Sequence, residues 1–275
     1  MSSLSINTNL NALSAQRHIS SSASDMETRL NRMASALQIN TAADDAAGLA
    51  ISEGMSAQIR GTSQSVQNLQ DGVSMLQTAE GGVQGIQSNL QRMRELSIQA
   101  SNDITGEAGR SAIQAEMDQI MEEIDRSVET VSFNEQELLS GDAEAAIELH
   151  AGPDRDETVS ISISEMSTEA LGVDEIDVTE EGGAGEAIET LNTAINQVST
   201  ERANIGSVQN RLEGAIDFLQ VMEENIMASE SQIRDADMAA EATELAQDQI
   251  TTQAGVSTLG QAMNLQGSTA SQLLG

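Results

Sequence analysis

Both ends of the chain carry the repeat of a long heptad helix, and this feature restricts its fold more than any other. Apolar residues recur at alternating steps of three and four through about the first 140 and about the last 70 residues. Between these regions, only a short stretch alternates polar and apolar residues in the manner of β-strands. The pattern predicts a mainly α protein, a long antiparallel helical bundle or coiled coil with a small β-hairpin, whose two ends pair.

Narrow apolar seams mark the predicted helices. The seams cover residues 6–37, 66–93, 113–124 and 188–226, and a weaker last helix starts near residue 237. Small residues at 40–54 break the first pattern, and Gly81 and Gly82 interrupt the second helix, which indicates a bend or a close helix approach. Alternating residues on both sides of Gly152-Pro153-Asp154 predict the hairpin.

The balance of charge excludes several classes of partner. The net charge is −32, Lys is absent, and all 12 basic residues are Arg. Nucleic acids and anionic membranes bind basic surfaces, so we expect no nucleic acid partner. The sequence has no run of about 18 apolar residues, so we expect no membrane insertion. The N-terminal MSSLSINTNL also lacks the basic and apolar segments of a Sec signal peptide.

The same charge favours a host that lives in high salt. Repulsion between carboxylates hinders association in dilute buffer, but molar salt screens it to within about 3 Å. Lys, Tyr and Cys, whose side chains titrate at about 10.4, 10 and 8.5, are all absent, so the net charge barely changes at alkaline pH. We hypothesise a halophilic adaptation, with alkaline brine as its stronger form. Compositional drift is the alternative.

No arrangement of residues is typical of catalysis. Nucleophilic catalysis usually needs a His base, and His18 and His150 stand in unrelated settings. Neither belongs to an HExxH zinc motif, and the sequence has no GxxxxGK[ST] or GxGxxG phosphate loop. The acidic clusters at 154–157 and 174–177 lack the spacing of a calcium-binding loop. We therefore expect no enzymatic activity, no catalytic residue, no cofactor and no metal site.

Blocks at both ends of the chain resemble bacterial flagellin. Near the front stand INTNLNALSAQRHI, INTAADDAAGLAISEGM and GVSMLQTAEGGVQGIQSNLQRMRELSIQASN, followed by IQAEMDQIMEEIDR and FNEQELLSG. Near the back stand NIGSVQNRLEGAIDFLQ, ASESQIRDADMAAEATELAQDQI and QAGVSTLGQAMNLQ. The blocks keep the family's order and leave no room for the variable outer domains of large flagellins, so the resemblance is to a short form.

The resemblance implies the structural subunit of the bacterial flagellar filament, which assembles helically with copies of itself into a tube for motility. It implies an inner coiled-coil domain of residues 1–44 with 235–275, and an outer helical rod of residues 45–234 with the β-hairpin near 137–170. It also implies export by flagellar type III secretion to an extracellular filament. The export apparatus, an export chaperone and cap or junction proteins would be further partners.

The resemblance also points to two groups of residues that meet partners. One group resembles the patch that flagellin-sensing Toll-like receptors read in related proteins, and we also expect it to pack between subunits: Gln91, Arg92, Leu96, Gln99, Ile113 and Glu116. Because cations are scarce here, we expect Arg92 and Arg94 to form ion pairs between subunits. The other group is the inner-domain assembly seam: Ile6, Leu10, Leu13, Leu30, Met33, Leu37, Val256, Leu259 and Met263.

Two other functions stay open from the sequence. The flagellar hook–filament junction protein shares the terminal helices, although its termini resemble these less well and its aromatic YIF-type motif is missing here. An acidic secreted helical adhesin is the alternative from another class. Such a protein has no need of unpaired terminal heptads, and it should fold from end to end as a monomer.

Overall fold

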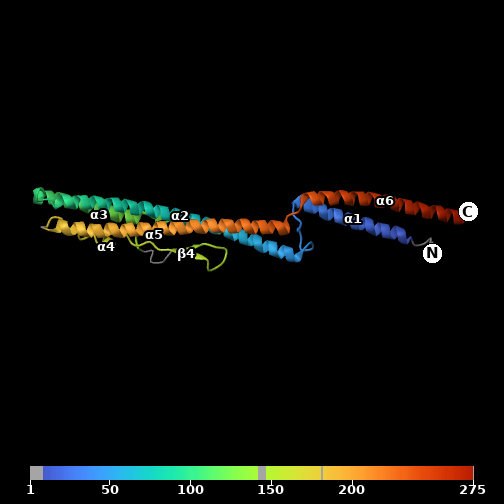
Figure 1. The fold of residues 1–275 in the computed structure, drawn as a ribbon, viewed down its shortest axis with the longest axis horizontal. Helices are drawn as coiled ribbons and strands as arrows, with labels where there is room; N and C mark the ends of the chain where they lie inside the picture. Colours follow the sequence, from blue (N-terminus) through green and yellow to red (C-terminus); the bar gives the residue numbers. More distant parts are fainter. Residues whose placement is uncertain (1–8, 142–146, 181, 275) are drawn as a thin grey trace. The chain divides into compact units, whose positions relative to one another are not determined.

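The computed structural model describes residues 9–141, 147–180 and 182–274, and five long helices make up most of them (Figure 1). The helices are α1 (Leu10–Ser35), α2 (Ala46–Ala100), α3 (Gly106–Thr130), α5 (Gly183–Arg234) and α6 (Met238–Leu274). A 3-10 helix (Asp103–Thr105) lies between α2 and α3, and the short α4 (Thr168–Leu171) precedes α5. The strands are β1 (Ser132–Phe133), β2 (Gln136–Glu137), β3 (Ile147–His150) and β4 (Thr158–Ile161). The predicted mainly α fold is confirmed.

The chain divides into two compact units. Met1–Ala57 and Asn225–Gly275 form the terminal unit, and Gln58–Glu224 forms the rod unit. The predicted functional domains, 1–44 with 235–275 and 45–234, stay a prediction. Within the described residues, no helix is long and apolar enough to cross a membrane.

The predicted heptad seams build the core of the rod unit, in which α3 and α5 lie along α2 (Figure 1). On α2 the buried side chains recur every seven residues, at Leu69, Leu76, Val83 and Leu90. On α5 they recur at Leu191, Val198, Ile205, Leu212 and Leu219. The rod therefore buries aliphatic side chains along extended seams, as expected for a chain with only two aromatic residues.

A close approach, one of the two predicted explanations, accounts for Gly82. A Cβ atom at this position would lie 2.8 Å from Cγ2 of Val131 and 3.0 Å from Cδ1 of Leu139. Any larger residue would push away the segment that follows α3, because contacts below about 3.0 Å are repulsive. Glycine is therefore required here by the neighbouring chain.

The predicted hairpin forms from β3 and β4, which pair antiparallel from Ile147 opposite Ile161 to His150 opposite Thr158. Leu149 packs onto α2 at Gly72, where a Cβ atom would overlap its Cδ1. The sequence did not indicate the β1–β2 ladder or α4. The start of α4 is fixed by Asp125 of α3, whose Oδ2 accepts a hydrogen bond of 2.8 Å from the Thr168 hydroxyl.

Candidate functional site

The terminal helices α1 and α6 lie side by side and antiparallel (Figure 1). Leu37 and Asp235 form an antiparallel bridge where the two helices meet. Beside it, the Ala236 amide donates to the Ala36 carbonyl at 3.0 Å. The Asp237 carboxylate then starts α6 by accepting hydrogen bonds from the amides of residues 239 and 240. The C-terminal end of α1 and the start of α6 are thus joined at one point, from which the two helices run on as a pair.

The face between α1 and α6 follows a heptad register made mostly of small and polar residues. In α1 the half-buried positions that follow this register are Ala12, Ala15, Ile19, Ser22, Met26, Arg29 and Met33, and Ser14, Thr28 and Arg32 are half-buried beside them. In α6, between residues 238 and 264, the positions that are not exposed are Glu241, Leu245, Asp248, Thr252, Gly255, Leu259 and Ala262. A Cβ atom on Gly255 would lie only 2.9 Å from Cγ1 of Ile19, so the helices approach closely there. Small residues allow this approach and leave little apolar area in the face.

A cluster of charged side chains sets the alignment of α1 against α6. Nε of Arg29 donates to Asp248 at 2.6 Å, and its Nη1 lies 3.3 Å from Glu241 and also contacts Glu244. The hydrogen bond to Asp248 is the main cause of a raised pKa at Arg29. Arg32 forms a second contact with Glu241, and Glu241 is only 8% exposed. Because a partly buried charge is costly without its partner, the cluster favours one alignment of α1 against α6.

Most residues of the predicted assembly seam lie outside this intramolecular face. Leu10, Leu13, Leu30, Val256 and Met263 are between 49% and 69% exposed. Met33, Leu37 and Leu259 are half-buried, and Ile6 lies outside the described residues. The terminal unit therefore presents apolar side chains that the described chain does not cover, and such surfaces commonly mark protein contacts.

The other predicted group divides into exposed and buried members. Gln91, Arg92, Gln99 and Glu116 are exposed, whereas Leu96 and Ile113 are 2% and 6% exposed. Leu96 and Ile113 belong to the core of the rod unit and pack beneath the exposed residues. Contacts with a partner would fall to the four exposed residues.

The two cations near this surface differ. Arg92 pairs within the rod, with Glu116 at 2.8 Å and with Glu95 at 3.3 Å, and these hydrogen bonds raise its pKa. The expected ion pair of Arg92 between subunits therefore has an intramolecular competitor. Arg94 is exposed and forms no ion pair with any other described residue.

The described residues contain no group of three His, Cys, Asp or Glu placed to hold a metal ion. His18 and His150 are both exposed, and they lie on α1 and β3. The exposed apolar side chains of α1 and α6 are the feature of the described surface that fits association with another protein surface.

The turn before α2 depends on a carboxylate with a shifted pKa. Oδ2 of Asp44 accepts hydrogen bonds from the Thr41 amide at 2.9 Å and the Thr41 hydroxyl at 3.0 Å. The hydrogen bond from the Thr41 amide is the main cause that lowers the pKa of Asp44 below its ordinary value. The charged carboxylate is therefore the form that stabilises the turn.

Replacement of Asp44 by Asn is expected to destabilise the chain at pH 7 and to matter less in acid. Because the folded pKa is lower than the unfolded pKa, the stabilisation is complete above the unfolded value and is lost as the pH falls through the folded value. The unfolding midpoint in urea should thus differ between wild type and Asp44→Asn at pH 7, and the difference should shrink towards pH 2. The exposed Asp71, changed to Asn, is the control. A difference that is constant with pH would contradict this role.

Comparison with known proteins gives matches at both ends of the chain. The family described as bacterial flagellin N-terminal helical region matches residues 6–144, and the bacterial flagellin C-terminal helical region matches residues 188–272. A flagellin of Halalkalibacterium halodurans is 40% identical over 98% of this chain and 99% of its own length. A flagellin of Bacillus subtilis is 37% identical over 98% of this chain and 99% of its own length.

Two further similarities extend these matches. The flagellar filament 33 kDa core protein of Treponema phagedenis is 37% identical over 94% of this chain and 95% of its own length. The crystal structure of Bacillus cereus flagellin matches with a TM-score of 0.50 and 27% identity, over 55% of this chain and 88% of that chain.

Proposed function

The chain belongs to the bacterial flagellin family, and we propose that copies of it join into a filament through the α1–α6 pair. It is a structural subunit of the bacterial flagellar filament and self-assembles helically. The junction protein and the adhesin are not favoured, because relatives that span nearly the whole chain are flagellins and filament core proteins.

The apolar stripes of the terminal helices carry this proposal. Leu10 and Leu13 on α1, and Val256 and Met263 on α6, are all at least 49% exposed. Apolar area that is exposed in one copy is buried when copies associate, and that burial drives assembly. Contacts between different faces of neighbouring copies build helical filaments when the rotation between copies does not close into a ring. The predicted seam would thus act between subunits, while the Arg29 cluster holds each pair together.

Replacement of Leu13 by Asn is expected to raise the lowest concentration that supports polymerisation at least tenfold. A tenfold change corresponds to about 1.4 kcal/mol, which is within the range for burying one leucine. Sedimentation of the polymer at a series of concentrations measures this threshold. The control is Gln16→Asn, a polar exchange at an exposed position of the same helix, which should polymerise like wild type. Equal thresholds for both variants would contradict a role of Leu13 between subunits.

The exposed residues Gln91, Arg92, Gln99 and Glu116 form a second surface that we assign to packing between subunits. The ion pair of Arg92 with Glu116 links the exposed side chains of α2 and α3 across this surface. Recognition of this surface by a Toll-like receptor would be a consequence in the presence of an animal host. Leu96 and Ile113 would contribute by holding the two helices in place.

The remaining proposals concern export and chemistry. The flagellar filament formed by the relatives lies outside the cell, and we propose that this chain reaches it by flagellar type III secretion. The export apparatus, an export chaperone and cap or junction proteins would then be its partners. Flagellins are structural proteins, and we propose that this chain has no catalytic activity.

Because the chain is strongly acidic, we expect filament assembly to require high salt. With a net charge of −32, neighbouring copies repel each other, and molar salt reduces the range of that repulsion to about 3 Å. We expect long filaments at molar salt and few in dilute buffer, as seen by electron microscopy after seeding. Filaments of equal length in both buffers would remove the halophilic hypothesis and leave the filament function intact.

A further inference from the structure

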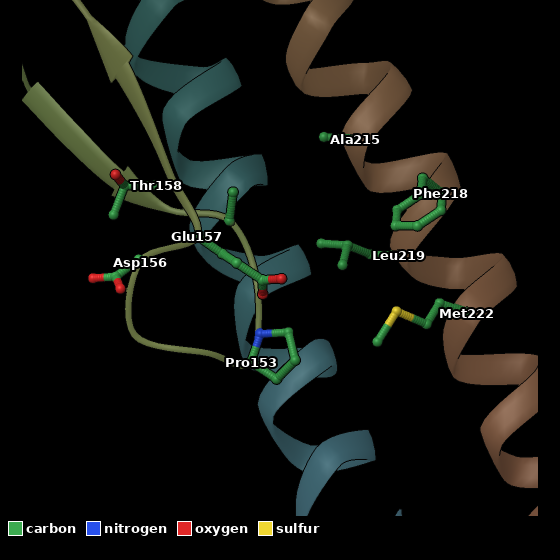
Figure 2. Close-up of a pocket in the computed structure, with 9 residues that line it drawn as sticks. Pro153, Asp156, Glu157, Thr158, Ala215, Phe218, Leu219 and Met222 are labelled. Atoms are coloured by element: carbon green, nitrogen blue, oxygen red, sulfur yellow. The ribbon is translucent and has the colours of Figure 1, made fainter.

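A cleft on the rod unit holds apolar side chains that the described chain leaves partly uncovered. It has a volume of about 280 Å³ and lies between the β3–β4 loop and α5. Pro153 approaches it from the loop, while Phe218, Leu219 and Met222 face it from α5 (Figure 2). The apolar side chains make the cleft a candidate for contact with another protein surface.

Phe218 is the unusual member of this cleft. The chain has two aromatic residues, and this one is 67% exposed. The buried seam of α5 runs through Leu212 and Leu219 and leaves Phe218 outside the core. Aromatic side chains bury a large area, and in protein interfaces they are enriched among the residues that carry the binding energy. A partner that covers Phe218 would therefore gain more from this position than from any exposed aliphatic residue nearby.

The loop side of the cleft is acidic. Asp156 and Glu157 line it, and no basic residue is among the lining residues. Asp154 and Arg155 lie beside them in the same exposed loop, so residues 154–157 carry three carboxylates and one cation. The surface that fits this cleft thus carries an apolar side chain for Phe218 and a cation for the carboxylates.

We propose that the cleft receives the exposed face of α2 of a second copy of this chain, at Arg94 and Ile98. This inference rests on the proposed self-assembly of the chain. Ile98 is 51% exposed, and Arg94 lies one helical turn before it on the same face. Arg94 forms no ion pair with a described residue, whereas Arg92 is already held by Glu116. Ile98 would pack on Phe218, and Arg94 would meet Asp156 or Glu157.

The length of α2 sets the distance between the two surfaces within one copy. Pro153 lies over Gly61 of α2. A Cβ atom added to Gly61 would lie 3.1 Å from the Cβ atom of Pro153. Arg94 and Ile98 follow about 35 residues later on the same helix, which at 1.5 Å per residue is about 50 to 55 Å. Because the contact joins two different surfaces, it builds an open row of copies when the rotation between neighbours does not close into a ring. Copies would follow one another in a row with this repeat.

Cross-linking tests the contact, because the chain has no cysteine of its own. The variant with both Met222→Cys and Ile98→Cys is assembled into filaments, treated with a short bismaleimide and denatured. The two thiols of one chain are too far apart for the reagent, so a ladder of joined chains requires the proposed contact between copies. The control pairs Ile98→Cys with Ala203→Cys, an exposed position of α5 outside the cleft, and should give no ladder.

A second variant keeps the test decisive if the double variant assembles poorly. Phe218→Ala should raise the concentration needed for polymerisation at least tenfold, whereas Gln220→Ala, at a neighbouring exposed position, should not. Filaments of the double variant without a ladder, or an unchanged threshold for Phe218→Ala, would overturn the docking and leave the filament function standing. A wild-type chain that forms no filament under any condition would instead remove the proposed function.

Discussion

Removal of residues 1–40 is expected to abolish filament formation while the rod unit stays folded. The deletion takes away α1 and with it the only helix that packs along α6 in the described chain. Alone, α6 is weakly apolar and would be marginal in water. The buried core of the rod lies between Val66 and Leu219 and contains no residue of α1. Electron microscopy should therefore show no filaments, and circular dichroism should show a cooperative thermal transition close to that of the full chain.

Two results would contradict this expectation in different ways. Filaments from the truncated chain would mean that the α1–α6 pair is not needed for assembly. Global unfolding of the truncated chain would mean that the rod unit depends on the terminal unit. The full-length chain, prepared and seeded in the same buffer, is the control for both measurements.

Reversal of the charge at Arg29 is expected to separate α1 from α6 and to prevent assembly. Arg29→Glu removes three contacts with carboxylates and adds a fourth carboxylate beside Glu241, Glu244 and Asp248. The side chain of Arg29 is 22% exposed, so loss of its partners costs on the order of 1 kcal/mol or more, between the values for surface and for buried ion pairs. The face has little apolar area to offset this loss, because small and polar residues fill much of it. The helical signal in circular dichroism should fall, and sedimentation should detect no polymer.

The matched control is Arg17→Glu, which makes the same change in net charge on the same helix. Arg17 is exposed and forms no ion pair with a described residue, so this variant should keep its helices and polymerise at molar salt. Equal loss of assembly in both variants would assign the effect to net charge. Rescue of Arg29→Glu by the further change Asp248→Arg would confirm the pairing.

The rod could be predicted from the sequence because its signals are strong and local. The seams of α2 and α5 consist of large aliphatic residues in heptad register, and the buried positions agree with them from Leu69 to Leu219. The Gly152-Pro153-Asp154 turn gave the position of the hairpin. The short elements escaped prediction because contacts outside them fix them, as Asp125 fixes the start of α4.

The face between the terminal helices could be read only partly from hydrophobic spacing, and the role of the predicted seam between subunits stays a prediction. The predicted seam followed the large apolar residues, Leu10, Leu13 and Leu30, which the structure leaves exposed. The actual face combines apolar residues such as Ile19, Met26 and Leu259 with alanine, serine, glycine and paired charges, and only the apolar members give a hydrophobic signal. The heptad spacing of Ile19, Met26 and Met33 is the part of this face that the sequence shows. The break predicted at 40–54 was also too long, because small residues at 46–54 are compatible with the helix that begins at Ala46.

The two neighbouring cations Arg92 and Arg94 show a related limit of sequence reasoning. Spacing along α2 places Arg92 and Arg94 on the surface, but it does not tell which of them has a partner within the rod. Glu116 is distant in sequence and reaches Arg92 only because α3 packs beside α2. Long-range pairs of this kind follow from tertiary packing, and periodicity within one helix does not report them.

Image reconstruction by electron cryomicroscopy, on filaments grown from the purified chain at molar salt, tests most directly how this flagellin assembles. We expect a tube whose innermost wall consists of α1 and α6 of every copy, with Leu13 and Val256 buried between copies. The rod unit should form the wall outside it. A tube lined by the rod unit, or one in which the stripes of α1 and α6 remain exposed to solvent, would contradict assembly through the terminal helix pair.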